Sequence, residues 1–229
     1  VKELGVEGAN YQAVEFTGET IKSMTLASRM AIANMSSEMG AKTGLVDPTG
    51  LDLWYPFEPT FADSGAEYVR ELTFDVSALR PQIAKPHSPE NVVAIDEVLG
   101  TKVHYAFIGS CTNTRLEDLH AAADVLKGKK LSSGVRLIIA PASKKVFNDA
   151  LKDGTIGILS DAGATFITSG CGPCVGSHLG VPGDGEVVIS STNRNFQGRM
   201  GNPRAQVYLG SPAVVAASAL AGEIMEPTE

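Results

Sequence analysis

From residue 103 onward, short apolar runs alternate with longer segments in which apolar residues recur at helical spacing. The apolar runs predict buried strands, at residues 103–108, 135–140, 165–168 and 187–191. The segments with helical spacing predict helices, at residues 115–126, 143–151 and 211–222. Strands that alternate with helices of this length favour an α/β fold, with parallel or mixed sheets flanked by helices in three α/β/α layers.

The first hundred residues show a weaker pattern. A short strand is predicted at residues 14–16. Apolar residues at mostly helical spacing then predict one long helix over residues 21–39, with Gly40 as its C-cap. Prolines and aromatic residues without a clear period predict a loop over residues 47–66.

Three prolines between residues 81 and 91 predict a linker. We therefore expect two domains, a smaller α/β domain over residues 1–98 and a second α/β domain over residues 99–229. Ligands of open parallel sheets bind beyond the carboxyl ends of the strands. The polar turns that follow the predicted strands of the second domain are therefore expected to converge.

Composition excludes some classes of protein. The chain has 229 residues, of which 43% are hydrophobic and 20% charged, as in globular proteins. A net charge of −7 argues against a nucleic-acid surface. The sequence shows neither an apolar run of membrane-spanning length nor a secretory signal. Three cysteines in such a chain favour a reducing compartment, so we expect a cytoplasmic protein.

The three cysteines carry the strongest chemical signal. Cys171 and Cys174 form a Cys-Gly-Pro-Cys turn after one predicted strand, and Cys111 follows another. Three thiolates can hold an iron–sulfur cluster and leave one iron open as a Lewis acid. Neighbouring glycines would let the backbone approach such a bulky group. The plainer interpretation is that Cys111 is a buried apolar residue and that Cys-Gly-Pro-Cys is a tight turn. The pair of cysteines between glycines, with a third cysteine at another strand end, weighs against it.

Two other chemistries remain open on the cysteines alone. Cys-Gly-Pro-Cys has the spacing of thiol–disulfide oxidoreductases. That chemistry has no use for Cys111 or for the arginines that follow the fourth predicted strand. A structural zinc site prefers four protein ligands, and His178 is the only histidine near the turn.

Four segments together resemble the aconitase superfamily: NMSSEMGA at 34–41, GSCTN at 109–113, CGPCVG at 171–176 and NRNFQGR at 193–199. They span most of the chain in the family's order. More narrowly, the chain resembles the branch that contains the large subunits of archaeal 3-isopropylmalate dehydratases and homoaconitases. The resemblance implies aconitase-like domains and a [4Fe–4S] cluster held by Cys111, Cys171 and Cys174.

The resemblance also implies roles for other residues. It implies that Glu38 is catalytic and handles the water or hydroxyl at the open iron. It implies that Arg194 and Arg199 bind substrate carboxylates, for which a bidentate cation is suited. Three amides are expected around the cluster: Asn34, Asn113 and Asn193. On the predicted long helix, the spacing of four residues places Asn34 and Glu38 on one face.

The implied activity is that of a hydro-lyase, which isomerises a 2-hydroxy polycarboxylate by dehydration and rehydration. Isopropylmalate, in leucine biosynthesis, and homocitrate both remain open as substrates. The family implies a separate small subunit with a swivelling domain, in a heterodimer or heterotetramer. It also implies an earlier domain with catalytic His and Asp residues, which these 229 residues lack. We therefore expect the chain to be part of a larger subunit and to be inactive alone.

Overall fold

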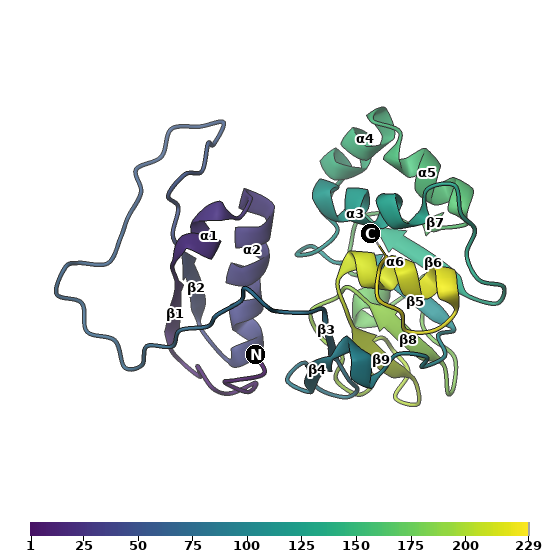
Figure 1. Cartoon of the computed structure of the whole chain (residues 1–229), viewed down its shortest axis with the longest axis horizontal. Helices are drawn as coiled ribbons and strands as arrows, with labels where there is room; N and C mark the ends of the chain where they lie inside the picture. The colour runs from purple at the N-terminus through teal and green to yellow at the C-terminus, as the bar shows by residue number, and fades with distance from the viewer. Residues whose placement is uncertain (229) are drawn as a thin grey trace.

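The structure is a computed structural model, and it describes residues 1–228 (Figure 1). Its main feature is a seven-stranded sheet with the strand order β4-β3-β9-β8-β5-β6-β7. The strands are β3 (Gln82–Ala84), β4 (Val92–Ala94), β5 (Tyr105–Gly109), β6 (Arg136–Ala140), β7 (Thr165–Phe166), β8 (Val187–Ser190) and β9 (Gln206–Leu209). The five strands from β9 to β7 are parallel, and β3 and β4 add an antiparallel edge. The predicted α/β class with a mixed sheet flanked by helices is confirmed.

Four helices cover one face of this sheet (Figure 1). They are α3 (Leu116–Leu126), α4 (Lys144–Lys152), α5 (Thr155–Ala162) and α6 (Pro212–Ala221). Ser143 and Ser211 cap α4 and α6 as expected, each accepting a hydrogen bond from a backbone N–H three residues on. Strand residues such as Ile108 and Ile139 alternate toward this face and form the larger core with the helices.

The opposite face of the sheet is covered mainly by irregular chain. Tyr105 and Phe107 of β5 point toward it and pack with Met200 and Cys174. Cys174 belongs to the short 3-10 helix η3 (Gly172–Val175). The second helical layer expected from the strand–helix pattern is thus replaced by η3 and loops. The long connections after β7 and β8 fold back over this face of the sheet.

The predicted linker at residues 81–91 is wrong in part. Residues 82–84 and 92–94 are the strands β3 and β4, which pair with each other, and Ala84 pairs with Leu209 of β9. These strands are only three residues long, and their pairing depends on β9, so local sequence gives little signal. They precede the domain boundary expected at residue 98, yet they belong to the sheet of the second unit; the division into two domains remains a proposal.

The N-terminal unit contains β1 (Ala13–Phe16) and β2 (Thr43–Val46), which pair in parallel, with α1 (Glu19–Ser23) and α2 (Leu26–Met35). The single helix expected over residues 21–39 is wrong. Thr25 interrupts it as the N-cap of α2, accepting a hydrogen bond from Ser28 N–H. Beyond Met35 the chain tightens into the 3-10 helix η1 (Ser36–Met39), which ends at Gly40 in the expected left-handed conformation.

A long irregular segment connects the two sheets. No helix or strand occurs between β2 and β3, which confirms the loop predicted over residues 47–66 and extends it to residue 81. Every residue from 54 to 80 is exposed, including Trp54 with 92% of its surface accessible. Figure 1 shows this segment extending away from both sheets. Across residues 1–228, no helix has the length and apolarity needed to cross a bilayer.

Candidate active site at the carboxyl ends of the parallel strands

The predicted site residues meet where the parallel strands of the main sheet end, and we call this side of the sheet its carboxyl edge. Strands β8, β5, β6 and β7 run parallel, so their carboxyl ends share this edge. Cys111 follows β5, Asn193 follows β8, and the Cys171–Cys174 turn follows β7. The Cys111 and Cys171 side chains are exposed, and Cys174, within η3, is half-buried.

The three thiols lie within electrostatic reach of one another. Burial raises the pKa of the Cys174 thiol above its ordinary value, and the neighbouring Cys171 and Cys111 add to this rise. The guanidinium of Arg199 acts in the opposite direction, because it favours the Cys174 thiolate. All three cysteines are free thiols in the structure.

The loop that carries Cys111 is held rigidly by side-chain hydrogen bonds. Ser110 Oγ accepts from the backbone N–H of Thr112 and of Asn113, over 3.2 and 2.7 Å. Thr114 is fully buried, and its φ of 101° is one that β-branched residues rarely adopt. Strained backbone of this kind persists only where the surroundings fix it, and it is concentrated at functional sites.

A second group of side chains joins the N-terminal unit to this edge. Asn34, the second-last residue of α2, offers its Oδ1 atom to two donors. Thr112 Oγ1 donates to it over 2.8 Å and Asn193 Nδ2 over 2.6 Å. Asn113 Nδ2 donates to the Ser191 carbonyl over 2.9 Å and weakly to Asn193 Oδ1 over 3.5 Å. The three predicted amides therefore form one network, and buried Thr112 is a member that the sequence analysis missed.

Glu38 and Arg194 form an ion pair across the two units. The Arg194 Nε atom lies 2.8 and 2.9 Å from the two carboxylate oxygens of Glu38. The Glu38 side chain is only 3% exposed, whereas that of Arg194 is 41% exposed. Among residues 1–228 only Nε of Arg194 is hydrogen-bonded, so its terminal nitrogens are available to a ligand carboxylate. Glu38 lies in η1 and not on the helix with Asn34, which corrects the expected shared helix face.

Arg199 lies on the same loop as Arg194 but has a different environment. Its Nε–H is buried and finds no hydrogen-bond partner among residues 1–228. Buried donors are normally satisfied, so this N–H is available as a donor to a group bound beside Cys174. Both predicted arginines therefore lie at the carboxyl ends of the strands, Arg194 paired with Glu38 and Arg199 beside Cys174.

The donor set fits an iron–sulfur cluster better than a single metal ion. Three soft thiols from two loops, with an unpartnered guanidinium N–H beside one of them, match the ligands and the hydrogen-bond donor that a cluster requires. In the part of the chain that is described, no three His, Cys, Asp or Glu side chains lie close enough to hold one ion. A cluster spans wider separations between its ligand sulfurs than one ion does.

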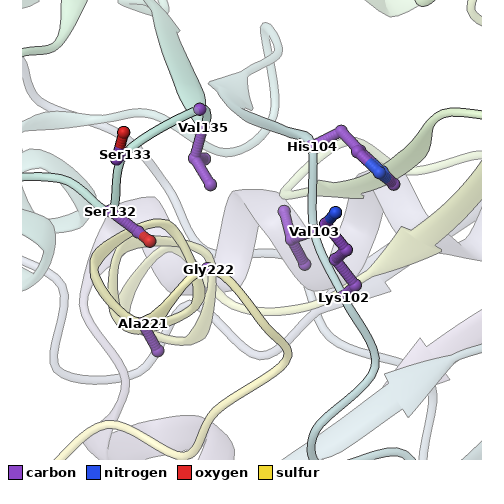
Figure 2. A pocket seen from close by; sticks show the side chains of 9 residues that line it. Lys102, Val103, His104, Ser132, Ser133, Val135, Ala221 and Gly222 are labelled. Carbon is purple, nitrogen blue, oxygen red and sulfur yellow. The ribbon is translucent and has the colours of Figure 1, made fainter.

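Figure 2 shows a hollow at the opposite edge of the main sheet. Its residues precede β5 and β6 or end α6, so it lies at the amino ends of the parallel strands. None of the predicted site residues lines it. The lining residues are Lys102, Val103, His104, Ser132, Ser133, Gly134, Val135, Ala221 and Gly222.

Comparison with known proteins identifies the family. The family model described as "Aconitase family (aconitate hydratase)" matches residues 1–55 and 97–222, which leaves most of the exposed connecting segment outside the match. The chain is 49% identical, over 98% of its length, to 3-isopropylmalate dehydratase large subunit 1 of Methanopyrus kandleri. It is 50% identical, over 99% of its length, to a probable methanogen homoaconitase large subunit of Methanosarcina mazei.

A third relative is 3-isopropylmalate dehydratase large subunit 2 of Archaeoglobus fulgidus, at 48% identity over the whole chain. The chain spans little more than half of these curated relatives, between 56% and 59% of their lengths. The family match covers well over half of the chain, and the relatives match it along nearly its whole length. The chain therefore belongs to the aconitase family.

Proposed function

We propose that this chain is the cluster-bearing portion of a hydro-lyase large subunit that isomerises a 2-hydroxy polycarboxylate. The observation that carries the proposal is the meeting of three thiols with the Glu38–Arg194 pair at one strand edge. A [4Fe–4S] cluster on Cys111, Cys171 and Cys174, when bound, would supply a Lewis-acidic iron that polarises the substrate hydroxyl. The family match and the names of the relatives support the same reaction class.

The cationic residues of the edge fit the binding of a substrate with several carboxylates. Arg194 presents its terminal nitrogens while Nε is held by Glu38, so its orientation is fixed before a ligand binds. Arg199 has a buried Nε–H without an acceptor, and a substrate carboxylate or a cluster sulfur would satisfy it. The Asn34, Asn113 and Asn193 network would orient donors around the same group.

Glu38 is the residue proposed to exchange a proton with the substrate hydroxyl or with water. Its carboxylate is nearly fully buried, and Arg194 holds it in place as an ion pair. The Ser37 hydroxyl, which donates to the Asn34 carbonyl over 2.9 Å, also lies 3.2 Å from Glu38 Oε1. A carboxylate fixed in this manner has one orientation and little competing water, which suits a general acid or base.

The relatives support two substrates. Two of them are named 3-isopropylmalate dehydratase large subunits. Our first proposal for the substrate is therefore an isopropyl-substituted malate, in leucine biosynthesis. The probable homoaconitase of similar identity makes homocitrate the second. Because these relatives are longer and are named large subunits, we propose a small-subunit partner and expect the 229 residues alone to be inactive. Three free thiols fit a reducing compartment, and we propose the cytoplasm.

Anaerobic reconstitution with iron and sulfide tests the proposal. The chain should take up iron and acid-labile sulfide in equal amounts and gain broad visible absorbance. Cys→Ser changes at each of the three cysteines should reduce that uptake. Turnover should then be measured with the complete large subunit and a small subunit, on 3-isopropylmalate and homocitrate in parallel, by the ultraviolet absorbance of the unsaturated acid.

The rival chemistry predicts different results. A Cys-Gly-Pro-Cys oxidoreductase would form a reversible disulfide between Cys171 and Cys174 and take up no iron, and a structural site would take up zinc. Either outcome, or dehydratase turnover by the 229-residue chain alone, would overturn the proposed division of labour.

A further inference from the structure

Arg115 is a second arginine of this edge with a buried Nε–H that finds no acceptor among residues 1–228. The first is Arg199, which is already proposed to bind the substrate. A buried guanidinium N–H without an acceptor is unfavourable, because the group has lost water and gained no replacement. Such a donor is explained where a bound ligand supplies the missing acceptor.

The backbone at Arg115 is fixed next to Cys111. The Asp118 carboxylate accepts hydrogen bonds from the N–H groups of Thr114 and Arg115, over 2.8 and 2.9 Å. Thr114 holds its strained conformation inside this arrangement, so Arg115 starts from a rigid position. Its side chain reaches back along the loop, and Nη2 makes a long hydrogen bond of 3.5 Å to the Cys111 carbonyl.

The charge of Arg115 has no partner among the described residues. The Oδ2 atom of Asp118, three residues further on, is already used by two backbone N–H groups. Arg194, in contrast, is paired with Glu38. Arg115 is also the N-cap of α3, whose N-terminus favours an anion at the same place. Among the described residues, the unpaired guanidinium of Arg115 thus lies near the exposed thiol of Cys111.

We infer that Arg115 is a further substrate-binding residue, and that it binds a carboxylate of the substrate beside Cys111. The identity of this anion rests on the proposed function, whereas the anion site itself rests on the geometry of Arg115. The other anionic group that could accept a hydrogen bond from the Arg115 Nε–H is a sulfide of a cluster bound to Cys111. The experiment therefore measures the two separately.

Alkylation of Cys111 measures anion binding at Arg115 without activity or a bound cluster. Iodoacetate carries a carboxylate and iodoacetamide does not, and both react with the thiolate. Their rates at Cys111, followed by mass spectrometry of its peptide in the metal-free chain, give a ratio. That ratio cancels any change in the thiolate fraction. We expect iodoacetate to be favoured at Cys111, and 3-isopropylmalate to slow its reaction.

Arg115→Gln should lower the iodoacetate-to-iodoacetamide ratio at Cys111 about fivefold, the rate equivalent of one ion pair at a partly exposed site. It should also abolish protection by 3-isopropylmalate. Arg115→Lys should restore part of the ratio, because it keeps the charge and loses the fork. The matched control is Arg70→Gln, an exposed arginine of the connecting segment, which should leave the ratio unchanged. Circular dichroism of each variant verifies that it is folded.

An unchanged ratio in Arg115→Gln overturns the inference, as does an equal fall in Arg70→Gln. A variant that keeps the ratio and the protection but takes up less iron and sulfide assigns Arg115 to the cluster, and this also overturns the carboxylate role. If the wild-type chain takes up no iron and sulfide, the proposed function fails. The alkylation ratio still decides whether Arg115 binds an anion.

Discussion

The Glu38–Arg194 pair joins the two units of the structure, and its two ends are buried to different extents. The Glu38 side chain is 3% exposed and the Arg194 side chain 41%. Removing Arg194 leaves a buried carboxylate without its partner, whereas removing the charge of Glu38 leaves an arginine that can turn toward water. The two single substitutions should therefore differ in cost, although they break the same contact.

The exposures set the magnitudes. Loss of one partner from a fully buried pair costs about 3–5 kcal/mol, and exposed pairs contribute about 0–1 kcal/mol. Because Arg194 is partly solvated, we expect Arg194→Ala to lower the free energy of unfolding by about 2 kcal/mol. Glu38→Gln preserves the shape and should cost about 1 kcal/mol. The double variant should cost less than the sum, since a neutral amide no longer needs the arginine.

Urea unfolding followed by far-ultraviolet circular dichroism measures these differences. Trp54 is unsuitable as a probe because it lies on the exposed connecting segment. The control is Lys145→Ala, which breaks an exposed pair with Asp149 within α4 and should change stability by less than about 0.5 kcal/mol. Equal costs for the two single variants, or a double variant that is additive within about 0.3 kcal/mol, would refute the reasoning.

Three further predictions concern the fold. Gly176→Ala should cost about 3 kcal/mol, from a φ of +69° and a Cβ that would lie 2.1 Å from the Gly201 nitrogen. Gly128→Ala, at a φ of +71° with open space around it, should cost only about 1 kcal/mol by thermal unfolding. Hydrogen bonds lower the pKa of Asp153 from 3.8 to about 2, so its contribution to stability is present above the unfolded value and lost as the pH falls. Asp153→Asn should flatten the fall in melting temperature between these two pH values, and an unchanged slope would contradict this. Brief chymotrypsin digestion should cut first within residues 54–80, where every residue is exposed, and a first cut inside the main sheet would contradict the exposure.

The sequence predicts most helices and the central strands of the second unit well, because a large buried core sets the spacing of their apolar residues. Strands β5 and β8 run where the apolar runs place them. Short elements such as β9 and α5 are not predicted from the sequence. Strand β9 has four residues, and its pairing with β8 and β3 supplies order that the local sequence does not. The break at Thr25 was also missed, since the apolar spacing continues across a capped helix start.

The candidate site could be predicted only as a set of residues. The parallel strands and their order explain why Cys111 and the Cys171–Cys174 turn reach one edge despite their separation in sequence. The ion pair between Glu38 and Arg194 depends on how the N-terminal unit packs against this edge. No pattern along the chain encodes that packing. Thr112 and Arg115 were visible as neighbours of Cys111, but their hydrogen bonds follow from the strained loop.

The division of these residues between two units has a consequence for how the site forms. The thiols and the arginines come from loops at the edge of one sheet, and the carboxylate comes from η1 of the other unit. Glu38 and Asn34 hold η1 and the end of α2 against that edge, through Arg194, Thr112 and Asn193. At the start of α2, Thr25 and Ser28 donate hydrogen bonds to Glu117 of α3. Part of the contact that docks the units is thus made by the residues proposed to act on substrate. A change that loosens the docking therefore moves the acid away from the thiols, so assembly of the two units and completion of the site are one event.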